Sequence, residues 1–168
     1  MATEEIAFHD NVRKLRHLLP AEEDDISINF PQYRGLSFKE FWEALPNKLE
    51  YFDYEEELTD ILANNKKLWI KKATGLGITE WTIRWIAWNC LKDDKWRDTQ
   101  VDVSAVIITG ANQDLTNKVV GRMKSLFNSE FKTKESVVIL NGCRIEAFPT
   151  NHLSPARGLN PKVVMLDE

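Results

Sequence analysis

The sequence predicts an α/β fold, in which a mostly parallel β-sheet is flanked by helices, carries an antiparallel hairpin and follows an N-terminal helical arm. From about residue 54 onward, short apolar runs typical of strands alternate with longer segments of helical periodicity. An Asn-Gly pair at 141–142 joins two such runs, as in a β-hairpin. We therefore expect residues 51–168 to form one layered domain and residues 1–50 an accessory arm.

Composition excludes several classes of protein. The chain has 168 residues, of which 43% are hydrophobic and 29% charged, as in a globular domain with a substantial core. No apolar run reaches the roughly 18 to 20 residues of a bilayer span, and the N-terminus lacks a signal-peptide pattern, so we expect a cytoplasmic protein without membrane contact. Two cysteines and three scattered histidines favour neither structural zinc nor disulfides. With a net charge of −4, any DNA contact must be local or lie outside this chain.

The arm contains two expected helices. Apolar spacing predicts the first over residues 6–19, which Pro20 and the acidic run 22–25 then end. Ser37 followed by Glu40 has the form of a capping box and predicts a second, short helix. Its apolar side would consist of Phe38, Phe41 and Trp42. The acidic run is more typical of a solvated loop than of a binding site.

The middle of the chain alternates between helices and strands. The pattern predicts a helix over residues 55–62, a short strand over 67–71 and a helix over 79–91. The last of these is apolar around most of its circumference, so we expect it to lie buried between layers. A strand over 101–109 and a helix over 112–127 follow. The apolar stripe of that helix is formed by Leu115, Val119, Met123 and Leu126.

The C-terminal part contributes the hairpin and one further strand. Residues 137–140 and 143–148 should pair through a type I′ turn, because Asn141 and Gly142 both tolerate positive φ. The apolar run 163–166 predicts a strand that ends at Asp167 and Glu168. An apolar strand at the very end of a chain favours a truncated gene product, one half of a split protein or a fragment chosen for expression.

The segment from Lys71 to Glu80 lies between a predicted strand and a predicted helix, where phosphate-binding loops occur. Backbone N–H groups and the positive end of the helix dipole converge there on an anion. Gly77 would let the main chain approach phosphate oxygens, and the Thr79 hydroxyl would ligate Mg²⁺. The match to GxxxxGK(S/T) has two departures, Lys72 at the first glycine and Ile78 at the lysine. An ordinary glycine turn is the alternative interpretation.

The strand 163–166 with its two carboxylates has the form of a Walker B motif. Ligands of open α/β sheets bind at the carboxyl edge of the strands. There Asp167 would hold the magnesium shell, and Glu168 would orient and deprotonate the attacking water. A buried strand can end in Asp-Glu by chance. Both signals together, in this order, indicate a P-loop ATPase.

Five segments carry a resemblance to a known family: IKKATGLGITE, IITGANQ, VVILNGCRIEAFPT, ARGLNP and VVMLDE. Together they resemble the ATPase domain of the large terminase subunit, the DNA-packaging motor of tailed double-stranded DNA viruses. The resemblance covers residues 51–168, about two thirds of the chain. It implies a RecA-like P-loop NTPase fold of the additional-strand, catalytic-glutamate type, truncated at Walker B and without the nuclease domain.

The same resemblance implies a function. ATP hydrolysis with Mg²⁺ would be coupled to translocation of double-stranded DNA into the procapsid, in the cytoplasm of an infected prokaryotic host. The chain would work in a homo-oligomeric ring, with the portal protein and the small terminase subunit as partners. Two rivals stay open, namely another P-loop motor of helicase type and a non-catalytic nucleotide-binding fragment.

The resemblance also implies roles for individual residues. It maps the phosphate-binding lysine onto Lys72, with Lys71 as the alternative, although both could simply be solvated at a strand end. Arg157 would be offered in trans to a neighbouring subunit's nucleotide, or else is an exposed loop arginine. Tyr54 could stack on adenine, but the expected glutamine is missing and packing of the arm is the alternative. The ATP-contacting set is Lys71, Lys72, Thr74, Gly75, Leu76, Gly77, Ile78, Thr79 and Tyr54.

Residues that face DNA are harder to assign. A locally basic stretch contains Lys118, Arg122, Lys124, Lys132 and Lys134. Lysines on the polar side of an amphipathic helix are more often solvated than bound to DNA. Four tryptophans between residues 81 and 96 suggest base stacking, but their place on a buried helix favours core packing.

Overall fold

The computed structural model describes residues 27–97, 103–128, 136–153 and 158–167, and it has an α/β architecture. Among the described helices, none combines the length and the apolar character that crossing a membrane requires. The expected helix at 6–19 and the acidic run 22–25 lie outside the described residues. The elements in chain order are a 3-10 helix η1 (Pro31–Tyr33), α2 (Phe38–Ala44), α3 (Asp53–Asn64), α4 (Ile78–Leu91), β1 (Ala105–Thr109), α5 (Gln113–Ser125), β2 (Val137–Leu140), β3 (Cys143–Pro149) and β4 (Val163–Leu166).

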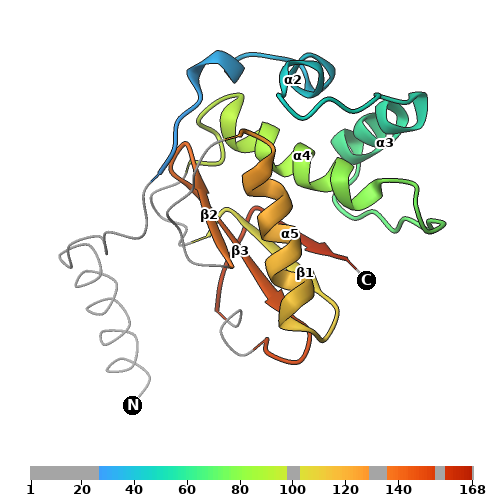
Figure 1. Ribbon diagram of the computed structural model, residues 1–168, viewed down its shortest axis with the longest axis vertical. Coiled ribbons are helices and arrows are strands. Elements are labelled where there is room, and N and C mark those ends of the chain that lie inside the picture. The colour runs from blue at the N-terminus through green and yellow to red at the C-terminus, as the bar shows by residue number, and fades with distance from the viewer. Residues whose placement is uncertain (1–26, 98–102, 129–135, 154–157, 168) are drawn as a thin grey trace.

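The four strands form one sheet in the order β2-β3-β1-β4 (Figure 1). Strand β1 pairs in parallel with both β3 and β4, while β2 and β3 are antiparallel. The expectation of a mostly parallel sheet with one antiparallel hairpin is therefore confirmed. In the β1–β4 ladder Ile108 lies opposite Leu166, and the Asp167 N–H continues the ladder by donating to the Ile108 carbonyl at 2.8 Å. The carboxyl ends of β1 and β4 thus share one edge.

The hairpin turn forms at the Asn-Gly pair, as the sequence predicts. Asn141 has a φ of 49° and Gly142 a φ of 74°. Glycine suits the positive φ at 142, and a Cβ there would lie 2.9 Å from the Arg97 Nε, so that the flexible Arg97 side chain would have to shift. The Asn141 side-chain amide donates to the Cys90 carbonyl at 3.0 Å and to the Asp94 carboxylate at 3.2 Å. Asn141 therefore closes the turn and also ties it to the C-terminal end of α4.

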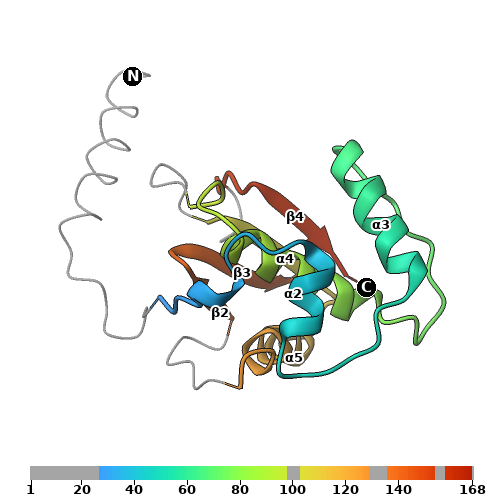
Figure 2. The ribbon, with the colours of Figure 1, turned by 90° about the horizontal axis from the view of Figure 1, so that it is seen from above.

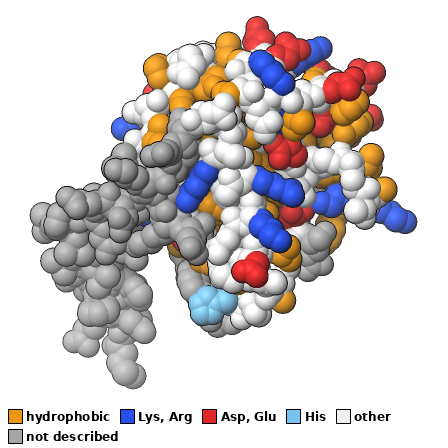
Figure 3. All heavy atoms as spheres, in the orientation of Figure 1, with side chains coloured by type: hydrophobic (Ala, Val, Ile, Leu, Met, Phe, Trp, Pro, Cys, Tyr) orange, Lys and Arg blue, Asp and Glu red, His pale blue; other side chains and the backbone are white. Residues whose placement is uncertain are grey.

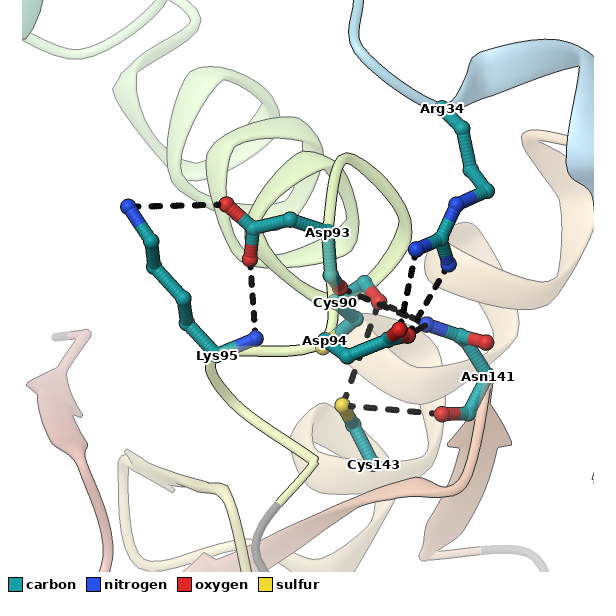
Figure 4. A network of polar contacts seen from close by, with 7 residues as sticks. All are labelled: Arg34, Cys90, Asp93, Asp94, Lys95, Asn141 and Cys143. Atoms are coloured by element: carbon teal, nitrogen blue, oxygen red, sulfur yellow. Dashed lines mark hydrogen bonds and ion pairs between the residues drawn. The ribbon is translucent and has the colours of Figure 1, made fainter.

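Asp94 joins three parts of the chain in the polar network of Figure 4. Besides the bond from Asn141, its carboxylate accepts one hydrogen bond from each terminal nitrogen of Arg34, both at 2.9 Å. This bidentate contact, with the bond from Asn141, holds the pKa of Asp94 well below its ordinary value of 3.8. The network fastens the segment before α2 to the end of α4 and to the hairpin.

Helices α4 and α5 cover one face of the sheet, and α2 packs on the outer side of α4 (Figures 1 and 2). On this face Ala105 and Ile107 of β1 join a single large apolar cluster with side chains from all three helices. Because alternate residues of a strand point to opposite faces, Val106 turns the other way. It belongs to a second cluster with Phe148 and with Leu159 of the loop before β4. The expectation that α4 is buried between layers is confirmed.

The contact between α2 and α4 is built from aromatic rings around one buried arginine. Arg84 is fully buried; its Nε donates to Glu80 at 3.0 Å and its Nη2 to the Asn47 carbonyl at 3.0 Å. The guanidinium lies 4.4 Å from the centre of the Trp42 ring, close enough for a cation–π interaction. The Ser37 capping box at the start of α2 is present as predicted. Residues of η1 and α2 thus share the cluster of α4, and the division of the chain at residue 50 stays a prediction.

Two local expectations are wrong. No strand forms over residues 67–71, because this segment joins no β-ladder and the Trp69 side chain is 90% exposed. Trp69 lies in solvent, whereas its neighbours Leu68 and Ile70 are half-buried, so this run packs through alternate residues without pairing to the sheet. Leu115, expected in the buried stripe of α5, is 45% exposed, because it lies in the first turn of the helix and lines a cavity beyond the sheet edge. The rest of that stripe, Val119, Met123 and Leu126, is buried as predicted.

We expect the substitution Arg84→Ala to lower the free energy of unfolding by about 3 kcal/mol, because it leaves Glu80 and the Asn47 carbonyl without their donor. Denaturant unfolding would measure the difference. Glu43→Ala, at an exposed position of α2, is the control and should change stability by less than about 0.5 kcal/mol. A loss for Arg84→Ala no larger than that of the control would show that this buried arginine contributes little to the α2–α4 contact.

Candidate functional site

The loop between residue 72 and the start of α4 presents uncapped backbone N–H groups. Gly75 and Gly77 adopt positive φ values of 90° and 72°, which lie in the left-handed region that favours glycine. Gly77 is the N-cap residue of α4, and no side chain caps the helix there. The first-turn N–H groups and the positive end of the helix dipole are therefore available to an anion.

Three polar side chains meet beside this loop. The Thr79 hydroxyl lies 3.0 Å from both carboxylate oxygens of Asp167 and donates to that carboxylate. The Lys72 ammonium donates to Asp167 Oδ1 at 2.9 Å and to Thr79 Oγ1 at 3.2 Å. The Lys72 and Asp167 side chains are 29% and 14% exposed, so the ion pair lies in a recess that solvent still reaches.

The fold explains why residues so distant in sequence meet. Asp167 directly follows β4, whose parallel pairing with β1 places it at the carboxyl edge of the sheet. Helix α4 lies against the sheet within the large apolar cluster and begins at that same edge. This edge is where open α/β sheets bind their ligands. The two motifs of the sequence therefore form one constellation.

The oxygen atoms of Thr79 and Asp167 are hard ligands of the kind that Mg²⁺ prefers. Among the residues that the structure describes, no group of three or more His, Cys, Asp or Glu side chains is arranged to hold a metal ion. A fully protein-built metal cage is therefore not formed in this part of the chain. Magnesium bound with a nucleotide commonly needs only one or two carboxylates, because phosphates and water complete its shell. The donor set here fits that second kind of site.

Tyr54 is attached to the loop through its hydroxyl group. The hydroxyl donates to the Leu76 carbonyl at 2.7 Å, and the ring stacks on Phe52 with 5.6 Å between the centroids. Burial, with a smaller contribution from the Glu55 carboxylate, raises the pKa of Tyr54, which keeps the hydroxyl protonated as a donor. Tyr54 thus fixes the loop, and its role toward adenine stays a prediction.

The other residues of the expected site differ in their placement. Lys71 is exposed and has no hydrogen bond or ion pair with the described residues, unlike Lys72. Thr74 and Leu76 are exposed on the loop. Ile78 is buried, so the position that carries lysine in the standard motif packs into the interior. Arg157 and Glu168 lie outside the described residues.

A cavity of about 320 Å³ opens next to Thr79 and Asp167. Sequence reasoning did not identify it, because its wall comes from the end of β1 and from one side of α5. The end of β1 at Thr109, followed by Gly110, was the available signal, since it also ends a parallel strand at the carboxyl edge. The buried Thr109 and Thr116 hydroxyls lie 2.7 Å apart and fasten this strand end to α5. Besides Thr79 and Asp167, the lining consists of Thr109, Gly110, Leu115, Lys118, Val119 and Arg122.

Comparisons with known proteins add no relatives to this description. No family model matches the chain, and neither a curated protein nor a solved structure is significantly similar to it. Function is therefore inferred from the residues of the site and from the motifs of the sequence.

The substitution Gly77→Ala should lower the free energy of unfolding by about 1 kcal/mol, because a Cβ is strained at positive φ even where space is free. Gly121→Ala in α5 is the matched control. Space is also free there, φ is not positive, and the helix should gain up to about 1 kcal/mol. Thermal and denaturant unfolding would compare the two variants. Equal effects of the same sign would contradict the left-handed conformation assigned to Gly77.

Proposed function

We propose that this protein is an ATPase of the P-loop type, which binds Mg²⁺ and ATP between the glycine loop and the end of β4. The contact of Thr79 with both Asp167 and Lys72 is the observation that supports this proposal. It joins the two halves of a nucleotide site that the sequence separates by 88 positions.

The loop would bind the phosphates through its backbone. The uncapped N–H groups at the start of α4 provide donors, and Gly75 and Gly77 leave room for close approach of an anion. Lys72 would exchange its contact with Asp167 for the phosphate oxygens, since a flexible ammonium reaches either group from one place. Before nucleotide binds, the same lysine neutralises the carboxylate.

Thr79 and Asp167 would hold Mg²⁺ through the hydroxyl and one carboxylate. Bound there, the ion would neutralise charge on the phosphates of the nucleotide. Glu168 directly follows Asp167 in sequence, and we propose it as the base that orients and deprotonates water. Arg157 is proposed to stabilise charge on the phosphate of a neighbouring subunit.

The more specific proposal is a DNA-packaging motor of the terminase type. The resemblance of five segments over residues 51–168 supports it. The proposal includes a P-loop NTPase fold, a homo-oligomeric ring, double-stranded DNA as the translocated polymer, and the portal protein and small terminase subunit as partners. The proposed location is the cytoplasm of an infected prokaryotic host.

A non-catalytic nucleotide-binding protein is the second candidate. The burial of Ile78 favours it, because this position supplies the phosphate-binding lysine in the standard motif. With Ile78 turned inward, the site depends on Lys72 for that charge. Binding of ATP without its hydrolysis would favour this candidate. A helicase-type motor would instead be recognised by unwinding of duplex DNA.

We expect Lys72→Ala to weaken ATP binding at least about tenfold, because a charge-assisted hydrogen bond to phosphate is lost. Lys71→Ala is the matched control, since it removes the same charge one residue away, and it should change the dissociation constant less than about twofold. Calorimetric titration with Mg²⁺ and ATP measures both. If the two substitutions act equally, Lys72 is not the phosphate ligand.

A further inference from the structure

Two cationic side chains line the cavity beside the proposed nucleotide site. Lys118 and Arg122 stand four residues apart on α5, so one turn of helix places them on the same side. They share the lining of the cavity with Thr79 and Asp167. The cavity therefore has cations on one wall and the start of α4 on the other.

These cations have no anionic partner in the part of the chain that the structure describes. Neither the Lys118 side chain nor the Arg122 side chain takes part in a hydrogen bond or an ion pair there. The one carboxylate among the lining residues, Asp167, is already bound by Lys72 and Thr79. Like charges four residues apart on a helix repel each other, so an anion between them would be stabilising. Figure 3 shows Lys and Arg side chains gathered on the face over α5.

The size and the remaining walls of the cavity indicate which anion it would take. About 320 Å³ holds a phosphate group with water, and it lies at the lower end of small-ligand sites. Leu115 and Val119 form an apolar wall, beside which a charge is screened less than in open solvent. Gly110 lies against this wall, because a Cβ at its position would lie 3.3 Å from the Leu115 Cδ1.

We propose that this cavity binds a phosphate dianion between Lys118 and Arg122 on α5 and Thr79 on α4. Two sources offer this chemistry, namely free orthophosphate and the terminal phosphate of a bound nucleoside triphosphate. The second source rests on the proposed function; the first does not. A cavity of this size suits one phosphate group, whereas a DNA duplex needs a broader exposed surface. Lys118 and Arg122 are thus assigned to phosphate binding.

The test measures orthophosphate binding by calorimetry or by ³¹P NMR titration. The double substitution Lys118→Ala with Arg122→Ala should weaken binding at least about tenfold, because it removes two charged donors. Lys39→Ala with Lys95→Ala removes the same net charge from exposed sites outside the cavity, so binding should change less than about twofold. Thermal unfolding checks that both double variants fold. If the cavity double variant does not fold, orthophosphate binding is measured with the single substitutions Lys118→Ala and Arg122→Ala.

A second arm identifies the source of the phosphate. If the nucleotide supplies it, the cavity variant weakens ATP binding at least about tenfold and ADP binding less than twofold, because ADP lacks the third phosphate. If ATP and ADP binding stay unchanged while orthophosphate binding falls, the ligand is free orthophosphate. If the wild-type protein binds orthophosphate but no nucleotide, the proposed function fails and the phosphate site stands.

Two results would overturn the inference. One is wild-type protein that binds no orthophosphate, or that loses binding equally in the cavity and control variants. The other is a cavity variant that keeps orthophosphate and ATP binding but loses affinity for double-stranded DNA. In that case Lys118 and Arg122 would contact the nucleic-acid backbone instead.

Discussion

The hydroxyl of Thr79 and the carboxylate of Asp167 lie 3.0 Å apart, and the rest of the site is arranged around this contact. It requires that α4 begins where β4 ends. It also brings Lys72 into an ion pair with Asp167, so the loop before α4 returns toward the sheet edge. If either element shifted by one turn or one residue pair, the loop, the hydroxyl and the carboxylate would separate, and no common ligand could bridge them.

The hydrophobic core keeps this geometry in place. Helix α4 is held between the sheet and α2, with Trp81 and Arg84 buried on its length. The network around Asp94 fastens the other end of the helix to the hairpin turn. Because both ends of α4 are anchored, the uncapped N-terminal turn has a fixed place at the sheet edge. A rigid scaffold that presents a loop in this way is the common arrangement for ligand sites.

Much of this structure follows from local sequence patterns, and the exceptions have physical causes. The hairpin at Asn141, the capping box at Ser37 and β4 each depend on residues close in sequence, so they were predictable. The absence of a strand at 67–71 was not predictable, since half-buried Leu68 and Ile70 alternate with exposed residues as in a strand, yet the segment pairs with no other strand. The sequence predicted a role for Lys72 and a role for Asp167, but not the ion pair between them. The cavity lined by Lys118 arises from tertiary packing, which no local motif encodes.

The most direct measurement compares ATP binding with and without Mg²⁺ in the wild-type protein and in Asp167→Asn. A joint metal and phosphate site predicts that Mg²⁺ tightens ATP binding to the wild-type protein about tenfold or more, and that the substitution removes this gain. Without Mg²⁺, Asp167→Asn should bind ATP as tightly as the wild-type protein or more tightly, because it removes a negative charge and releases Lys72. Wild-type binding that is indifferent to Mg²⁺, or an equal loss in both conditions, would contradict the account.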